Sequence, residues 1–475
     1  MRTSGRALPG GIVSVATVAV AFMAFVAVAG TARADEAKIR RDLKAFFATE
    51  DAATRAKLAK EIETDPAYDR KKVSAWLHAA GLFEPLKPGN QEITAKLGGA
   101  ARTILLRVPQ GYDPNKAYPL IYALHPAGTP AAAMIDYTVK ALDTQAEAFI
   151  VAAPAEYRDF VIQKDKPATP EHTVFLRAIK HHVNVNSNRV YVLGYDVGGH
   201  AAWLLAVSQP DDFAGVISVS GALLLPSPVL DDTFLRNVAN LPVLAVWGKQ
   251  DTLDAAGKPR DDGGIAGLDT RLVATAKRLK VPVEGVEDPT KGHGDVTIPP
   301  EALKKLLAHE RPVAPAKVDK HFRAVGQSST YGLEGDGWMG DALNGKKLEV
   351  IVEPGEDVNS RTDFDKAFAR AFRIRLAELL GDAKGQALTV TRRKVNIVTV
   401  WLYDGLVDLA QPVTLTIGAT KVFNGKMTPS LLLALPQAAK TWDFERLRWA
   451  GLQSEASKDA KPVTVDTKLA DPTAE

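Results

Sequence analysis

The chain shows three successive patterns of hydrophobic and polar positions, and the first is helical. Apolar residues recur every three or four positions among Lys, Arg, Asp and Glu, as at Ile39, Leu43 and Phe46. This spacing predicts a helical N-terminal segment at residues 35–97. We expect its apolar face to form a packing collar on the domain that follows.

The second pattern, at residues 98–312, alternates short apolar runs with helix-length segments. Seven runs predict strands: Thr103–Val108, Leu120–Leu124, Phe149–Ala153, Val190–Leu193, Val216–Val219, Val243–Trp247 and Val281–Val286. Helices are predicted between several of them, at Pro170–His182, Gly199–Ser208 and Asp269–Leu279. Such alternation is typical of an α/β fold, with a mostly parallel sheet covered by helices on both faces.

The third pattern begins beyond Pro312 and Pro315 and predicts a small C-terminal α+β module at residues 313–455. Strands are predicted at Leu348–Val352, Leu388–Leu402 and Val413–Val422, with a helix at Asp363–Leu380. We expect Gly425 to supply a turn. The polar stretch at residues 456–475 predicts a disordered tail.

The first 34 residues have the pattern of a signal peptide. Arg2 and Arg6 precede the apolar run Ile12–Ala29, and the small residues Ala32 and Ala34 follow it. We expect cleavage after Ala34 and export to the periplasm or the medium, with no membrane span in the mature protein. The alternative is an uncleaved membrane anchor, because the apolar run is nearly long enough to cross a bilayer.

Composition narrows the possible partners and sites. The formal net charge is only +3 over 475 residues, so we expect no nucleic-acid partner. The chain has no cysteine, which excludes disulfides and thiolate metal ligands. The histidines at 125, 181, 182 and 200 lack metal-ligand spacing and are interpreted as structural or surface residues. We therefore expect neither a metal nor a cofactor.

The most informative motif is Gly194-Tyr195-Asp196-Val197-Gly198. It follows a predicted buried strand and opens a predicted helix, which is the layout of a nucleophile elbow. Glycines are needed there because the turn is too tight for side chains around the reactive residue. The motif makes Asp196 the candidate residue at the nucleophile position.

Two further residues complete a candidate triad. Asp251 follows the predicted strand Val243–Trp247, and His293 lies in a glycine-flanked loop after the last predicted strand. Their order along the chain, nucleophile then acid then histidine, is the order expected of such a fold. The alternatives are a turn-forming aspartate and a solvated loop histidine.

The central domain resembles the polyhydroxybutyrate-depolymerase and feruloyl-esterase branch of the α/β-hydrolase superfamily, with looser similarity to prolyl-oligopeptidase-type catalytic domains. The resemblance covers less than half of the chain, at Arg107–Asp113, Tyr118–Leu120, Leu124–Gly128, Gly194–Gly221 and Pro242–Asp251. It implies an α/β-hydrolase fold and an ester-like ligand, small or polymeric. In enzymes of this branch, a serine occupies the position that Asp196 has in this chain. The run Leu406–Leu415 is similar to a small module that trails some exported esterases.

An aspartate changes the chemistry of the elbow. Its attack on an ester carbonyl would give a mixed anhydride, so ordinary ester or peptide hydrolysis is disfavoured. A carboxylate does attack saturated carbon, and haloalkane dehalogenases and epoxide hydrolases of this fold use an Asp–His–acid triad. Those families place tryptophan after the nucleophile and carry a helical cap, whereas this chain has Val197 and only a short stretch at Ala222–Asn240.

The favoured hypothesis is therefore a catalytically degenerate protein with a binding or structural role. Aspartate tolerates unusual backbone angles, so the elbow survives the substitution. The second oxygen of Asp196 is expected to accept hydrogen bonds from the N–H groups of the oxyanion hole. These belong to Ala127 and Val197, since Pro126 has no N–H. Hydrolysis with Asp196 as a carboxylate nucleophile is the alternative.

Overall fold

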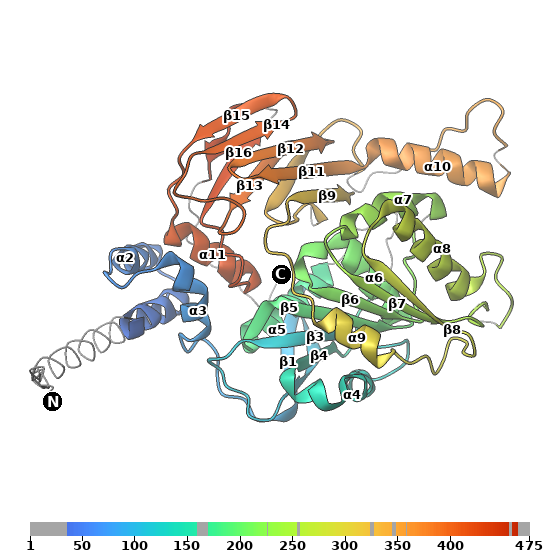
Figure 1. Ribbon diagram of the computed structural model, residues 1–475, viewed down its shortest axis with the longest axis horizontal. Helices are drawn as coiled ribbons and strands as arrows, with labels where there is room; N and C mark the ends of the chain where they lie inside the picture. Colours follow the sequence, from blue (N-terminus) through green and yellow to red (C-terminus); the bar gives the residue numbers. More distant parts are fainter. Residues whose placement is uncertain are drawn as a thin grey trace, which may run out of the picture.

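A computed structural model of the chain describes residues 36–158, 170–225, 227–253, 257–323, 327–343, 348–357, 359–455 and 458–463. The predicted signal peptide lies outside these residues. Figure 1 shows N-terminal helices, a central domain built on one sheet, and a C-terminal module with two smaller sheets. Within the described residues, no helix is both long and apolar enough to cross a membrane.

The central sheet has eight strands in the order β1-β2-β4-β3-β5-β6-β7-β8. From β4 onward the neighbouring strands are parallel, whereas β2 runs antiparallel to both β1 and β4. The mostly parallel α/β sheet predicted from the sequence is therefore confirmed. The strands are β1 Gly89–Leu97, β2 Ala100–Val108, β3 Tyr118–Leu124, β4 Ile150–Pro154, β5 Val185–Tyr195, β6 Gly215–Val219, β7 Val243–Gly248 and β8 Val283–Asp288.

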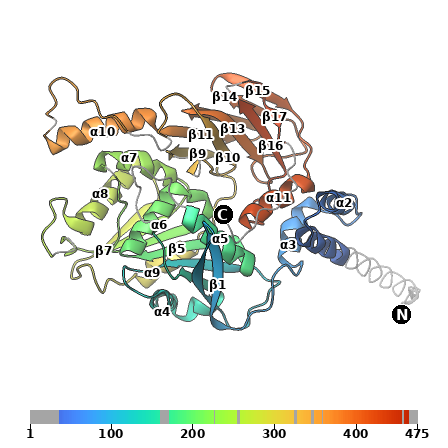
Figure 2. The same cartoon turned by 180° about the vertical axis from the view of Figure 1, so that it is seen from behind.

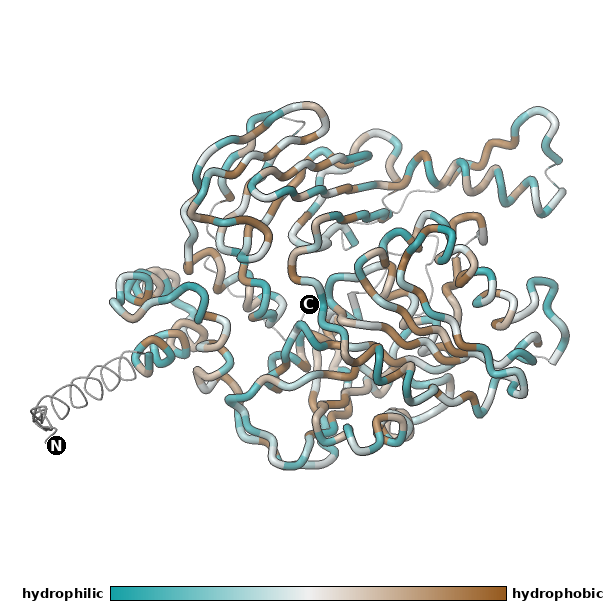
Figure 3. Tube along the Cα trace, in the orientation of Figure 1, coloured by the Kyte–Doolittle hydropathy of each residue, from teal (hydrophilic) through white to brown (hydrophobic). Residues whose placement is uncertain are grey.

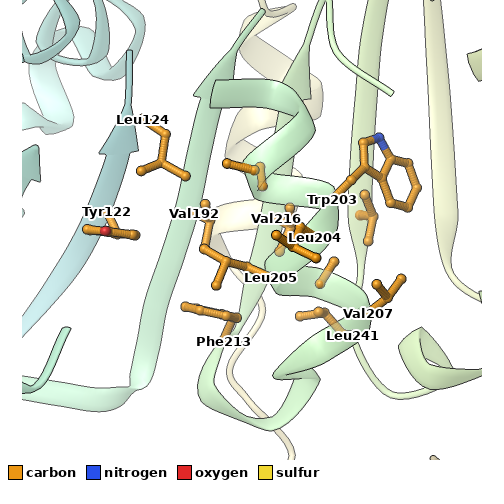
Figure 4. Close-up of a cluster of buried hydrophobic side chains, with 14 of the residues drawn as sticks. Tyr122, Leu124, Val192, Trp203, Leu204, Leu205, Val207, Phe213, Val216 and Leu241 are labelled. Carbon is orange, nitrogen blue, oxygen red and sulfur yellow. The ribbon is translucent and has the colours of Figure 1, made fainter. Parts of the chain in front are cut away.

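Helices cover both faces of this sheet because the inner strands are apolar on both sides. Every residue of β3 is buried, and its alternate side chains contribute to two separate clusters. Tyr122 and Leu124 pack with Leu205 and Phe213 on the face covered by α5 and α6, as Figure 4 shows. Figure 3 shows the same concentration of hydrophobic positions along the central strands. The helices are α4 Ala131–Leu142, α5 Pro170–His182, α6 Val197–Ser208, α8 Gly264–Leu279 and α9 Pro300–Leu307, with short turns at η2 Asp143–Ala148, η3 Pro210–Asp212, η4 Pro228–Leu230, α7 Asp231–Phe234 and η5 Leu235–Val238.

The N-terminal segment is helical only in part. Residues 36–48 form a helix, followed by α2 Ala52–Glu63, η1 Arg70–Lys72 and α3 Val73–His78. Residues 89–97, predicted as helical, instead form strand β1, which is a correction. The cause is a hairpin: Leu97 pairs with Ala100 across Gly98 and Gly99, both at positive φ. The central domain therefore begins before residue 98.

The C-terminal module contains a five-stranded sheet, β15-β14-β12-β11-β9, and a four-stranded sheet, β10-β13-β16-β17. Its elements are β9 Lys317–Phe322, β10 Leu333–Trp338, α10 Arg361–Arg375, β11 Ala377–Lys384, β12 Ala387–Arg393, β13 Val395–Leu402, β14 Val413–Ile417, β15 Thr420–Gly425, α11 Leu431–Thr441, β16 Ala450–Glu455 and β17 Lys461–Pro462. The N-terminal helices bury Ile39, Phe46 and Trp76 in the same core as both sheets. The expected collar on the central domain is therefore wrong: the helices pack on the C-terminal module.

Several local predictions in this module are corrected. Residues 348–352 form no strand, and the helix predicted to end at Leu380 ends at Arg375. Leu379 is a buried position of strand β11, which pairs with β9 and β12. Gly425 pairs with Val413 inside a strand, while Gly418 makes the turn. The predicted tail is ordered at residues 458–463, where β17 pairs with β16.

His78 joins all three parts of the chain. Its ring nitrogens lie 2.6 Å from Asn184 Oδ1 and 2.8 Å from Glu445 Oε1. The amide nitrogen of Asn184 donates to two carbonyls, so its oxygen faces the ring and must accept. Both ring nitrogens are therefore donors. Burial opposes protonation, but the bonds to Glu445 and Asn184 outweigh it and raise the pKa of His78.

Candidate active site

The elbow is a sharp turn between β5 and α6. Asp196 has φ 55° and ψ −118°, a conformation that L-residues rarely adopt. A Cβ added to Gly194 would lie 1.9 Å from the carbonyl oxygen of Gly198, and one added to Gly198 would lie 2.0 Å from that of Leu124. The glycines are therefore required by contact with backbone on both sides. The turn presents Asp196 above the carboxyl end of the sheet.

The three predicted site residues lie together. Asp251 follows β7 and His293 follows β8, so both stand at the same edge of the sheet as the elbow. His293 Nδ1 is 2.8 Å from Asp251 Oδ2, and His293 Nε2 is 3.1 Å from Asp196 Oδ1. The two loops approach closely because Gly248 has no side chain: a Cβ there would lie 2.2 Å from the carbonyl oxygen of Gly292.

The second oxygen of Asp196 faces backbone donors. The N–H of Ala127 donates to Asp196 Oδ2 at 3.3 Å, and the N–H of Val197 also bonds the carboxylate. These are the two donors predicted for the oxyanion hole. One oxygen of Asp196 thus faces the imidazole, and the other faces the groups that would hold a substrate oxyanion in a serine esterase.

The charges of the site favour an imidazolium between two carboxylates. Hydrogen bonds to Asp196 and Asp251 outweigh burial and raise the pKa of His293 to about 10. Burial opposes ionisation of Asp196, but bonds from His293, Val197 and Ala127 lower the pKa of Asp196 below its ordinary value. At neutral pH His293 is therefore protonated and unable to act as a general base.

Two tyrosines that the sequence patterns did not single out support the site. Tyr195 donates a hydrogen bond to the carbonyl of His293 at 3.1 Å, which ties the elbow to the histidine loop. Tyr157 donates to the carbonyl of His125, just before the oxyanion segment. The position of Tyr195 beside the elbow was a usable signal, whereas Tyr157 reaches the site only through the fold.

A pocket of about 430 Å³ adjoins these groups. Its walls come from helix α4 and from the segments beside the oxyanion donors, the elbow and His293. It is lined by Pro126, Met134, Tyr137, Lys140, Tyr195, Asp295 and Val296 among others. The rings of Tyr137 and Tyr195 meet edge to face, with centroids 5.5 Å apart. The pocket combines an apolar wall with charged groups and has room for a small ligand.

The other histidines have local contacts. His200 Nδ1 lies 2.7 Å from the carbonyl oxygen and 2.9 Å from the backbone nitrogen of Ala222, and the ring of His181 packs edge-on against Trp442. Over the described ranges, no three His, Asp or Glu side chains are grouped as a metal site would require.

Comparison with known proteins gives consistent matches to esterases. Residues 95–272 match the family model Esterase, described as "Putative esterase". The putative esterase NocK of Nocardia uniformis subsp. tsuyamanensis is 38% identical over 89 residues, covering 19% of this chain and 23% of that protein. Feruloyl esterase D of Neurospora crassa is 24% identical over 152 residues, covering 30% of this chain and 52% of that protein. The chain thus spans about a quarter and about half of the length of these two relatives.

Two hydrolases are among the solved structures that match part of the chain. The feruloyl esterase module from Clostridium thermocellum has 16% identity and a TM-score of 0.34, covering 44% of this chain and 84% of that chain. Poly(aspartic acid) hydrolase-1 from Sphingomonas sp. KT-1 has 14% identity and a TM-score of 0.37, covering 47% and 99%. Residues 95–272 therefore match the Esterase family, and they lie within a domain whose eight-stranded, mostly parallel sheet has the α/β-hydrolase fold.

Proposed function

We propose that this is an exported esterase-family protein that binds an ester-like ligand and does not hydrolyse it by the serine mechanism. The observation that carries the proposal is the placement of the Asp196 carboxylate. One oxygen bonds His293 and the other accepts from Ala127. The carboxylate therefore occupies the positions that a serine hydroxyl and a substrate oxyanion would share in an active esterase.

Two physical arguments support this proposal. A substrate carbonyl must displace the carboxylate from its backbone donors, and each hydrogen bond to a charged group is worth about 1.5–3 kcal/mol. The protonated His293 also has no lone pair on Nε2 with which to activate a nucleophile or water at neutral pH. Both effects oppose ester hydrolysis and leave binding intact, since the adjoining pocket is formed by other side chains.

The proposal is tested by restoring the hydroxyl. We expect Asp196→Ser to hydrolyse a short-chain p-nitrophenyl ester at least tenfold faster than the wild type at pH 8. Asp196→Ala is the matched control, since it removes the carboxylate without adding a nucleophile, and it should show no gain. A wild type as active as Asp196→Ser, or a folded Asp196→Ser no faster than Asp196→Ala, contradicts the proposal.

A second candidate function is hydrolysis at saturated carbon, and the same carboxylate favours it. Asp196 Oδ1 would displace a halide or an epoxide oxygen, which leaves with the bonding electron pair, and form an alkyl ester. The carbonyl oxygen of that ester, Oδ2, already faces Ala127. Water would then attack the carbonyl carbon of that ester and pass a proton to a neutral His293, and the acyl C–O bond would break to release the alcohol and restore the Asp196 carboxylate.

This candidate differs from the first in where an oxygen label goes. During turnover in H2(18)O, the label enters the Asp196 carboxylate only if the alkyl ester forms and water attacks its carbonyl carbon. Turnover should also rise with pH as His293 loses its proton, at a pH below about 10, because esterification removes the Asp196 charge that raises the pKa of His293. Peptide mass spectrometry that finds neither label nor adduct, after incubation with haloalkanes and epoxides at pH 7–10, eliminates the second candidate and leaves the first.

A further inference from the structure

A cavity of about 210 Å³ lies between the central domain and the C-terminal module, away from the elbow. Helices α5 and α11 lie side by side there (Figures 1 and 2). The central domain lines the cavity with α5 and η3, and the module lines it with α11 and the segment that follows. None of Asp196, Asp251 or His293 lines it, so it is separate from the candidate active site.

The distinctive group in this cavity is Lys180. Its side chain belongs to α5, and the residue is only 6% exposed. In the described parts of the chain its ammonium has no hydrogen-bond partner and no carboxylate within ion-pair distance, although it lines the cavity. A buried ammonium without a direct partner is costly, and an anion in the cavity would relieve that cost.

Most other charges around the cavity are already neutralised. Arg446 bonds Asp211 at 2.9 Å, and Arg448 bonds Glu334 at 2.5 Å. The carboxylate of Asp443 accepts hydrogen bonds from both terminal nitrogens of the buried Arg311, at 2.6 and 3.0 Å. These pairs hold the module against the central domain and leave none of their charges for a ligand.

Lys440 adds a second cation at the cavity. It lies in the last turn of α11, is half-buried, and has no ion pair within the described ranges. The remaining carboxyl there is Asp212. Burial and the neighbouring Asp211 raise the pKa of Asp212, although Lys180 and Arg311 act in the opposite direction. A raised pKa weakens the repulsion between this carboxyl and an anion bound beside it.

We infer that this cavity is a binding site for a small oxyanion, held by Lys180 from the central domain and Lys440 from the C-terminal module. Because the two lysines belong to different parts of the chain, a bound anion would strengthen the contact between them. Inorganic phosphate and small organic carboxylates share the required chemistry.

The test is thermal unfolding of the full mature protein in phosphate, in succinate, and in NaCl at matched ionic strength. We expect at least one oxyanion to raise the midpoint by roughly 3–8 °C more than NaCl at saturation. Titration calorimetry with phosphate alone and with succinate alone then shows which of the two anions binds more tightly.

Substitutions locate the site. Lys180→Met and Lys440→Met should each reduce the anion-dependent shift in the unfolding midpoint at least threefold. Lys440→Met is included because Lys440 is only half-buried, so this variant tests the site even if Lys180→Met fails to fold. Lys421→Met is the control, because Lys421 is exposed on β15 and does not line the cavity. No shift beyond NaCl in the wild type, or an equal shift in all three variants, overturns the inference.

Discussion

The protonation of His293 can be tested by removing one of its two carboxylate partners. Asp196→Asn keeps the shape of the side chain and removes its charge. The hydrogen bond between Asp196 Oδ1 and His293 Nε2 spans 3.1 Å, and a charge-assisted bond of this kind contributes about 1.5–3 kcal/mol. At 1.36 kcal/mol per pKa unit, that range corresponds to about 1–2 units.

Solvent reduces the expected effect. The side chain of His293 is 47% exposed, so the interaction is screened and the lower end of the range applies. We expect the pKa of His293 to fall by about 1 unit from about 10 in Asp196→Asn. Asp251→Asn should also lower it, because Asp251 holds the other ring nitrogen at 2.8 Å.

The assay is NMR titration of 13C-labelled histidine rings, with the His293 signal assigned from His293→Gln among the nine histidines. Glu301→Gln is the control, since Glu301 is exposed on α9 and forms no bond with the site. A wild-type pKa near the ordinary 6.5, or a value unchanged in Asp196→Asn, refutes the imidazolium between two carboxylates and removes the main obstacle to general-base catalysis.

Three further outcomes are expected. Gly198→Ala should lower the free energy of unfolding, measured with urea, by more than about 3 kcal/mol, because the added Cβ would overlap the Leu124 carbonyl. Gly294→Ala, at a position with open space around it, is the control and should leave the free energy of unfolding nearly unchanged. Because the pKa of His78 is raised in the folded protein, its protonation stabilises the fold fully below pH 6.5, and this stabilisation is lost as pH rises through the folded-state pKa. The thermal midpoint should therefore fall more between pH 6 and pH 9 in the wild type than in His78→Gln. If the leader is cleaved as predicted, intact mass measurement of the exported protein will match a chain that starts at Asp35; retention of the full mass in the membrane fraction favours the anchor instead.

The parts of the fold that the sequence predicted are those with strong local patterns. Strand β7 and helix α5 follow from an unbroken apolar run and a clear helical period, and the tight Gly-x-Asp-x-Gly turn indicates the elbow without any knowledge of distant contacts. Strand β1 was missed although Gly98-Gly99 is a strong hairpin signal between two alternating runs.

Other features depend on contacts that no local pattern contains. The end of α10 was misplaced because Leu376 and Leu379 continue a helical spacing, yet pairing with β9 places Leu379 in a strand. The relation of Asp196 to Ala127 was predicted from chemistry, but its distance required the folded sheet. The sequence around Lys180 is that of an ordinary helix lysine, and its burial beside α11 depends on the folded chain.

The shared core of the N-terminal helices and the C-terminal module has a consequence for biosynthesis. Ile39 and Phe46 are buried with Leu431 and Trp449, nearly four hundred residues later in the chain. Until those residues have been made, the apolar face of the first helices has no native partner and stays available to chaperones. This long-range closure delays completion of the native state until almost the whole chain is present.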